Sequence, residues 1–278
     1  MLRFTLNGTQ IEIEDGESRT LLEYLRNVKC MKGTKEACRT GHCGACSVLV
    51  DGKLMRSCVT LLRRVDGKTV ETIENAPNDA MLPVIQRSFL DVGAVQCGFC
   101  TPGMVIATKA LLLHNPAPAE REIYEGLKNN YCRCTGYVKI IEAVKLAAAR
   151  LRGETPDIDS FRTHESTVIV VGENQTVPPI TGSAVGKSVW DVDGMDKTGG
   201  KLKFCDDYTA EDIGADTLLH GAFVWAPVPH AKINAVDYAA AEQAEGVVRI
   251  VTAADVPGMN KMGTWTPEQP VFCTDEVN

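Results

Sequence analysis

The stretch CRTGHCGACSVLVDGKLMRSC, residues 38–58, gathers four cysteines in one short part of a chain of 278 residues. Its spacing is C-x4-C-x2-C, and a fourth cysteine follows after eleven further residues. Thiolates are soft ligands that bind zinc, copper(I) or iron–sulfur clusters, and this opening is typical of the plant-type [2Fe–2S] loop. Gly41 and Gly44 let the backbone bend tightly. The sequence therefore predicts a metal-binding loop, to which a hairpin through Asp51-Gly52 returns Cys58.

A second group of thiols follows in QCGFC and YCRC: Cys97, Cys100, Cys132 and Cys134. Both pairs come just before segments with helical periodicity, and helix N-termini favour negatively charged groups such as thiolates. A C-x-C pair is tighter than the usual zinc knuckle. Two adjoining iron–sulfur clusters would form a route for electrons between a donor and an acceptor.

Zinc remains the alternative metal for both groups, because four cysteines also form structural zinc sites. Disulfides are disfavoured, because the N-terminus lacks the apolar segment of a secretory signal. Three of the eleven cysteines stand alone and are expected to be small buried hydrophobic residues: Cys30, Cys205 and Cys273.

Composition indicates a globular protein of two or three domains, with 44% hydrophobic residues and a formal charge of −7. This negative charge argues against a broad surface for nucleic acids or anionic membranes. No run of 18 apolar residues is present, so no membrane span is expected. A cytoplasmic location is the default expectation.

The first part of the chain predicts a small mixed sheet crossed by one helix. Residues 3–7 and 9–14 alternate around Asn7-Gly8, a strong signal for a two-residue hairpin. Residues 21–28 have helical spacing after the candidate cap Ser18 or Thr20. Further strands are expected at 47–50, 54–62 and 69–73.

After Pro77 the period becomes helical, with helices expected near residues 79–92, 103–114, 119–130 and 138–150. Four such helices with short connections form a compact bundle. A connecting segment follows. Beyond it, a helix at 239–245 among strands at 218–225, 232–236 and 247–252 indicates a partial α/β domain. The fold class is therefore α+β.

The motifs resemble the iron–sulfur portion of the xanthine oxidase family of molybdenum hydroxylases. Residues 38–58, QCGFCTPGM at 96–104 and YCRCTGY at 131–137 carry this similarity, which covers about residues 1–152. VDGMDKTGGKLKFCDDY, residues 192–208, resembles the start of the family's molybdenum-cofactor portion. No flavin domain lies between them, a layout similar to that of flavin-free aldehyde oxidoreductases.

The resemblance implies four parts: a plant-ferredoxin-like β-grasp domain (1–76), a four-helix [2Fe–2S] domain (77–152), a linker (153–184) and the opening of an a/b hammerhead domain (185–278). It implies that one cluster, the outer one, is bound by Cys38, Cys43, Cys46 and Cys58. It implies that the inner cluster is bound by Cys97, Cys100, Cys132 and Cys134. Gln96 and Cys134 match positions that contact molybdopterin in relatives. No catalytic residue is assigned, because the family's catalytic glutamate belongs to a later part of the molybdenum portion.

The implied function is electron transfer during hydroxylation of an aldehyde, purine or other N-heterocycle, with water as the oxygen source. Electrons would pass from molybdopterin through both clusters to a flavin subunit or a soluble carrier. The implied partner is a large molybdenum-binding subunit on a separate polypeptide, with molybdopterin in its dinucleotide form at the interface. FAD would lie outside this chain, on a partner. The alternative is a free-standing two-cluster electron carrier or redox sensor.

Overall fold

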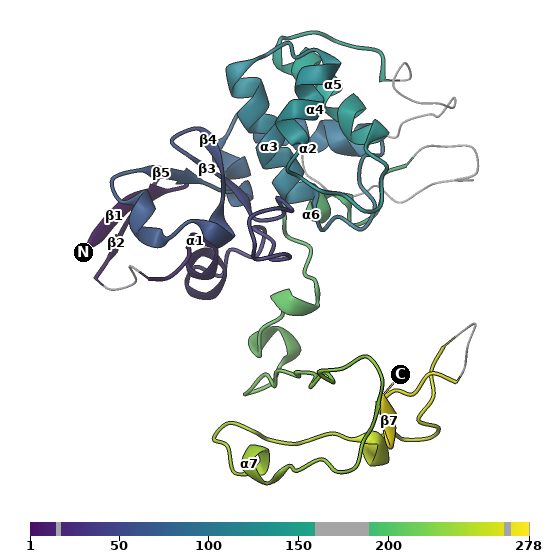
Figure 1. The fold of residues 1–278 in the computed structure, drawn as a ribbon. Coiled ribbons are helices and arrows are strands. Elements are labelled where there is room, and N and C mark those ends of the chain that lie inside the picture. The colour runs from purple at the N-terminus through teal and green to yellow at the C-terminus, as the bar shows by residue number, and fades with distance from the viewer. Residues whose placement is uncertain (15–17, 159–188, 264–267, 278) are drawn as a thin grey trace. The chain divides into compact units, whose positions relative to one another are not determined.

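The computed structural model describes residues 1–14, 18–158, 189–263 and 268–277, which form two compact units, Met1–Gly214 and Ala215–Asn278. In the first unit the described residues form a five-stranded sheet of order β2-β1-β5-β3-β4 (Figure 1). All neighbouring strands are antiparallel except β1 and β5, which are parallel. The strands are β1 (Leu2–Leu6), β2 (Thr9–Ile13), β3 (Ser47–Val50), β4 (Lys53–Arg56) and β5 (Thr69–Glu71).

Buried and more exposed side chains alternate along β1, and the buried ones belong to the hydrophobic core under the sheet. Phe4 is buried and makes an edge contact with Tyr24, whose ring centroid lies 5.8 Å away. The predicted hairpin is confirmed, because Asn7 and Gly8 take φ angles of 48° and 83° between β1 and β2. The predicted helix over 21–28 is also present, as α1 (Leu21–Glu23) and a π-helical turn, η1 (Tyr24–Val28). Thr20 and Glu23 form a capping box at its start.

The strand predicted over 54–62 is wrong in its second half. β4 ends at Arg56, and two short 3₁₀ helices follow, η2 (Ser57–Val59) and η3 (Leu62–Val65). Local hydrogen bonds form this turn, because the amide and the hydroxyl of Thr60 donate to the carbonyl oxygens of Ser57 and Arg56. The amide and the hydroxyl of Ser57 donate to the carbonyl oxygen of Cys46, so the turn lies against the cysteine loop, residues 38–46.

Four described helices follow the sheet: α2 (Leu82–Asp91), α3 (Thr101–His114), α4 (Glu120–Leu127) and α5 (Val138–Leu151). α2 packs against α3 and α5, and α4 also packs against α3 and α5. Their buried apolar residues form one core that also includes Leu49 and Ile73 from the sheet region. α3 packs against β3 and β4, and in Figure 1 this teal helix lies beside the blue strands. The sheet and the helices therefore share packed surface.

Residues 189–213, here called the docked segment, belong to the first unit. The segment includes α6 (Gly194–Thr198), which packs against α2 and α3, and the short 3₁₀ helices η6 (Cys205–Asp207) and η7 (Glu211–Ile213). Trp190 Nε1 donates to Asp91 Oδ1 at 3.1 Å. The ring of Phe204 meets the edge of Phe99 at a centroid distance of 5.0 Å. The segment is thus held against the end of α2 and the loop before α3.

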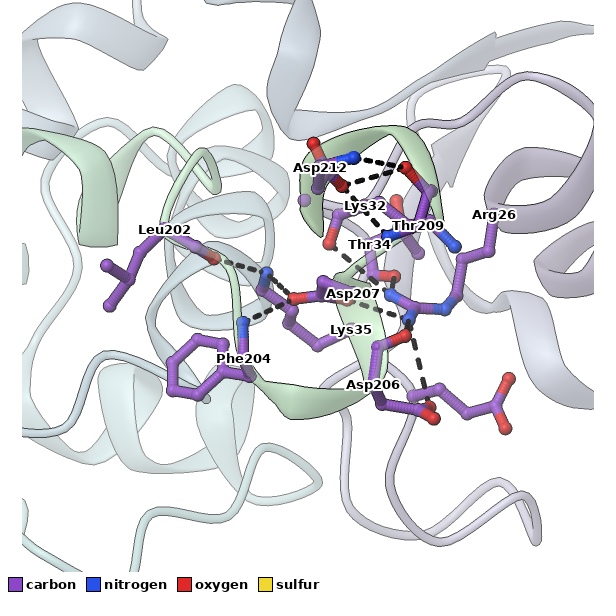
Figure 2. A network of polar contacts seen from close by, with 12 residues as sticks. Arg26, Lys32, Thr34, Lys35, Leu202, Phe204, Asp206, Asp207, Thr209 and Asp212 are labelled. Atoms are coloured by element: carbon purple, nitrogen blue, oxygen red, sulfur yellow. Dashed lines mark hydrogen bonds and ion pairs between the residues drawn. The ribbon is translucent and has the colours of Figure 1, made fainter. Parts of the chain in front are cut away.

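A buried carboxylate fixes the far end of the docked segment (Figure 2). Asp207 Oδ1 accepts a hydrogen bond from Arg26 at 2.7 Å, and Oδ2 accepts one from Lys35 at 2.7 Å. All three side chains are at most 3% exposed. Lys35 also donates to the carbonyl oxygen of Leu202 at 2.9 Å, and its Nζ lies 4.9 Å from the Phe204 ring centroid. Two buried cations of the sheet domain therefore share one carboxylate of the docked segment.

The second unit contains a two-stranded sheet of β6 (Ala231–Lys232) and β7 (Glu276–Val277), a short helix α7 (Ala239–Glu242) and the 3₁₀ helix η8 (Ala253–Asp255). The helix predicted at 239–245 is present but shorter. The strands predicted at 218–225 and 247–252 are wrong for the structure, since strand pairs in the described part of this unit involve other residues. A strand exists only where a partner completes its hydrogen bonds. Phe223, Val224 and Trp225 are exposed.

Most of the predicted linker, from residue 159 to 184, lies outside the described residues. No helix in the described part of the chain combines the length and the apolar composition needed to cross a membrane.

Candidate metal centres

The first group of thiols lies in the loop between η1 and β3 and in η2. The predicted hairpin through Asp51-Gly52 is confirmed, because Ser47 at the start of β3 pairs with Arg56 at the end of β4. The amide of Ser57 also donates to the carbonyl oxygen of Cys46 at 3.2 Å. Cys58 is therefore returned to the side of Cys46.

Backbone amides of this loop point at sulfur. The amides of Thr40 and Cys43 lie 3.4 and 3.5 Å from the Sγ atom of Cys38 and donate to it. Hydrogen bonding with Thr40 is the largest cause that lowers the pKa of the Cys38 thiol, to about 5. Gly44 holds a φ of 76°, which keeps the loop tightly curved. Amide hydrogen bonds to sulfur are typical of iron–sulfur ligands and help to set reduction potentials.

Cys58 is in a different electrostatic environment. Burial, followed by the neighbouring thiol of Cys46, raises the pKa of the Cys58 thiol to about 12. Without a cation, negative charge on both thiols is therefore unfavourable. A bound metal removes this penalty because it replaces the thiol protons.

The second group is assembled from the loops before α3 and α5. The Sγ atoms of Cys134 and Cys97 lie 3.6 Å apart. Burial, followed by the neighbouring Cys132, raises the pKa of Cys100. The hydroxyl of Thr135 donates to Cys132 Sγ at 3.2 Å. The structure therefore places the thiols in two close pairs, Cys97 with Cys134 and Cys100 with Cys132.

A short junction connects the two thiol groups. The amide of Tyr131, the residue before Cys132, donates to the carbonyl oxygen of Cys43 at 2.8 Å. The buried side-chain amide of Asn130 donates to the carbonyl oxygens of Gly44 and Gly103 at 3.1 and 3.0 Å. One backbone hydrogen bond thus joins Cys43 of the first thiol group to Tyr131, the residue before Cys132 of the second group.

The junction leaves no room for a side chain at Gly103. A Cβ atom there would lie 2.4 Å from the carbonyl oxygen of Gly44, which is backbone and cannot move alone. We expect Gly103→Ala to lower the free energy of unfolding by about 1–3 kcal/mol through overpacking. Urea denaturation of the full chain measures this change.

Gly126→Ala is the matched control, because it is also a helical glycine. Its Cβ atom would meet only the side chain of Leu111, at 3.2 Å, and alanine favours the helix by about 0.5–1 kcal/mol. Equal stability of the two variants would contradict the tight junction.

The remaining predicted residues lie at the surface. Gln96, directly before Cys97, and Cys134, a member of the second thiol group, are both exposed. The prediction that Cys30, Cys205 and Cys273 are buried is wrong, because all three are exposed. They lie in loops or at the start of a short 3₁₀ helix, where no apolar core covers them.

Arg56 and Asn130 carry no sequence signal for a metal site, yet they bind Ser47 and Gly44, next to Cys46 and within the cysteine loop. Arg56 Nε is buried without a hydrogen-bond partner among the described residues. In the sequence, only its place two residues before Cys58 marks it out.

The donors fit iron–sulfur clusters. Each group offers four soft thiols, held in loops with amide or hydroxyl donors directed at sulfur. Arg56 adds a buried N–H that has no acceptor among the residues the structure describes. Within the described ranges, no three or more His, Cys, Asp or Glu residues are grouped in a way that could hold a single metal ion.

Comparison with known protein families matches three parts of the chain. Residues 4–69 match a 2Fe-2S iron-sulfur cluster binding domain, and residues 69–145 match a [2Fe-2S] binding domain. Residues 199–278 match the a/b hammerhead domain of aldehyde oxidase and xanthine dehydrogenase.

Individual relatives agree with these matches. The aldehyde oxidoreductase of Megalodesulfovibrio gigas is 32% identical over 98% of this chain, which spans 30% of that protein's length. The small FeS subunit of nicotinate dehydrogenase from Eubacterium barkeri is 41% identical over 54% of this chain and 95% of its own length. The crystal structure of the aldehyde oxidoreductase from Desulfovibrio desulfuricans superposes with a TM-score of 0.80 at 30% identity, covering 99% of this chain and 30% of that one. The chain belongs to the xanthine oxidase family of molybdenum hydroxylases.

Proposed function

We propose that this chain transfers electrons within a molybdenum hydroxylase, from a molybdopterin site through two [2Fe–2S] clusters to an acceptor. The observation that carries the proposal is the 2.8 Å hydrogen bond from Tyr131 to Cys43, which connects the two thiol groups. In this proposal the outer cluster is held by Cys38, Cys43, Cys46 and Cys58. The inner cluster is held by Cys97, Cys100, Cys132 and Cys134, in the two pairs that the structure brings together.

The protein's own contribution is to position and insulate these groups. The clusters supply reversible one-electron chemistry when bound. The amides of Thr40 and Cys43 stabilise negative charge on the sulfur of Cys38. The buried side chain of Asn130 holds the two cysteine loops at a fixed separation. Such fixed dipoles need no rearrangement when an electron moves.

The molybdopterin site is proposed to lie against the exposed residues Gln96 and Cys134. We propose that a molybdenum-binding large subunit supplies the rest of this site and covers the apolar residues Phe223, Val224 and Trp225, which are exposed here. The substrate is an aldehyde, a purine or another N-heterocycle, with water as the oxygen source. The molybdopterin is in the dinucleotide form, and any FAD is held by a partner.

The proposed domain limits follow the sequence: a β-grasp domain to residue 76, a four-helix bundle to residue 152, a linker to residue 184 and then the hammerhead portion. The pairwise contacts among α2, α3, α4 and α5 support the bundle. The cysteine-rich composition supports a reducing, cytoplasmic compartment.

The proposal is tested by loading the full chain anaerobically with iron and sulfide and then reducing it. We expect about four irons per chain and two distinct [2Fe–2S] signals in electron paramagnetic resonance (EPR). A colourless protein with about two zinc ions would refute the proposal. Copurification from the source cells tests the partner, because a free-standing carrier would purify without a molybdenum-binding polypeptide.

A further inference from the structure

Arg56 lies where the two cysteine loops meet. It is the last residue of β4, two positions before Cys58. Its guanidinium donates to Ser47 Oγ at 2.9 Å, to the carbonyl oxygen of Asn129 at 2.9 Å and to Asn130 Oδ1 at 3.1 Å. Asn129 and Asn130 come just before the cysteines of the loop that precedes α5. One side chain therefore connects the end of the first thiol group with the backbone that leads to the second.

The positive charge of Arg56 has no carboxylate partner within the described residues, since its hydrogen bonds go to a hydroxyl, a carbonyl and an amide oxygen. Ser47, which accepts one of these hydrogen bonds, directly follows Cys46, and Arg56 itself lies two residues before Cys58. The unpaired charge therefore lies beside two thiols of the first group.

One N–H donor of the Arg56 guanidinium takes part in none of these hydrogen bonds. Nε is buried and has no partner among the described residues. A buried N–H without an acceptor costs about 1–3 kcal/mol. Sulfur ligands of metal clusters accept such hydrogen bonds. The unused donor and the unpaired charge therefore indicate the same missing partner.

We infer that Arg56 is the counter-charge of the outer cluster and raises its reduction potential. The inference rests on the proposed function, because it requires a cluster at the first thiol group. Transfer of one electron from the inner to the outer site oxidises the first and reduces the second, so the outer site gains one negative charge. A fixed, poorly solvated cation next to the outer site stabilises that charge. Arg56 thus favours electron flow outward, and its bonds to Asn129 and Asn130 hold the two sites at a constant separation.

The test is an EPR-monitored redox titration of the iron-loaded full chain with Arg56→Gln and Arg56→Lys. Glutamine removes the charge, and we expect the equilibrium for one-electron reduction of the outer cluster to weaken about tenfold, or 59 mV. Lysine keeps the charge but lacks the planar guanidinium, so the outer-cluster potential of Arg56→Lys lies closer to that of the wild type. The inner cluster shifts less in both variants.

Arg39→Gln is the matched control, because it removes the same charge beside Cys38. The Arg39 side chain is 76% exposed and already paired with Glu36, so solvent screens it and little shift is expected. Amide hydrogen exchange at Tyr131 gives a second readout, with faster exchange in Arg56→Gln and unchanged exchange in Arg39→Gln.

Each outcome bears on the role of Arg56. An outer-cluster potential that is unchanged in Arg56→Gln, or changed equally in Arg39→Gln, overturns the inference. If Arg56→Gln loses about two irons while Arg56→Lys keeps about four, the requirement for a counter-charge is supported. A wild-type chain without [2Fe–2S] signals would instead refute the proposed function itself.

Discussion

Replacing Asp207 with asparagine is expected to lower the free energy of unfolding by about 3–5 kcal/mol, because two buried cations lose their shared carboxylate. Arg26 and Lys35 are 3% and 2% exposed, so water cannot solvate the charges that remain. Asparagine keeps the size of the side chain, so the change reports on charge rather than on a cavity. Urea denaturation of the full chain gives the value.

Asp206→Asn is the matched control, one residue away. The Asp206 side chain is 79% exposed and lies 3.9 Å from Arg26, so we expect a change within about 0.5 kcal/mol. If Asp207→Asn were no more destabilising than Asp206→Asn, the buried network would not anchor the docked segment.

The effect of Asp207 should also depend on pH. Burial raises the pKa of its carboxyl, but hydrogen bonds from Lys35, the Phe204 amide and Arg26 outweigh burial and hold the pKa below its ordinary value of 3.8. A lowered pKa in the folded state stabilises the fold above the unfolded pKa, and this contribution is lost as pH falls through the folded pKa. The stability difference between the wild type and Asp207→Asn should therefore narrow below pH about 4.

Replacing Cys132 with serine is expected to remove one cluster selectively. The hydroxyl oxygen is a harder ligand than a thiolate and binds iron–sulfur clusters poorly. We expect about two irons per chain instead of about four, with one of the two EPR signals lost. Cys46→Ser should remove the other signal.

Cys30→Ser serves as the control for cysteine replacement. Cys30 is exposed and outside both thiol groups, so all of the iron should remain. Loss of both signals in Cys132→Ser, together with a normal thermal unfolding curve, would contradict the assignment of the thiols to two separate sites.

Sequence alone predicts the elements that depend on local interactions. Asn7-Gly8 specifies the first hairpin because both residues adopt positive φ angles there. The cysteine loop is recognised from its spacing, because three of its thiols lie within one short stretch of backbone. The four helices start and end within a few residues of their expected limits, since apolar periodicity and Pro102 define them.

Long-range contacts are what the sequence does not show. Asp207 meets Arg26 and Lys35 across more than 170 residues, and the acidic pair at 206–207 has no pattern of its own. Arg56 and Asn130 are polar residues whose importance depends on which loops they join. The segment 218–225 has the composition of a strand, yet strand pairing needs a partner that composition does not reveal.

The docked segment has a consequence for how this protein can be divided. The matched [2Fe-2S] binding domain ends at residue 145, and the matched hammerhead domain begins at residue 199. Transplanting only the portion before residue 152 would leave Arg26 and Lys35 without their counter-ion. A portable module of this chain that keeps both cations paired therefore extends through Asp207, past the point where family resemblance would cut it.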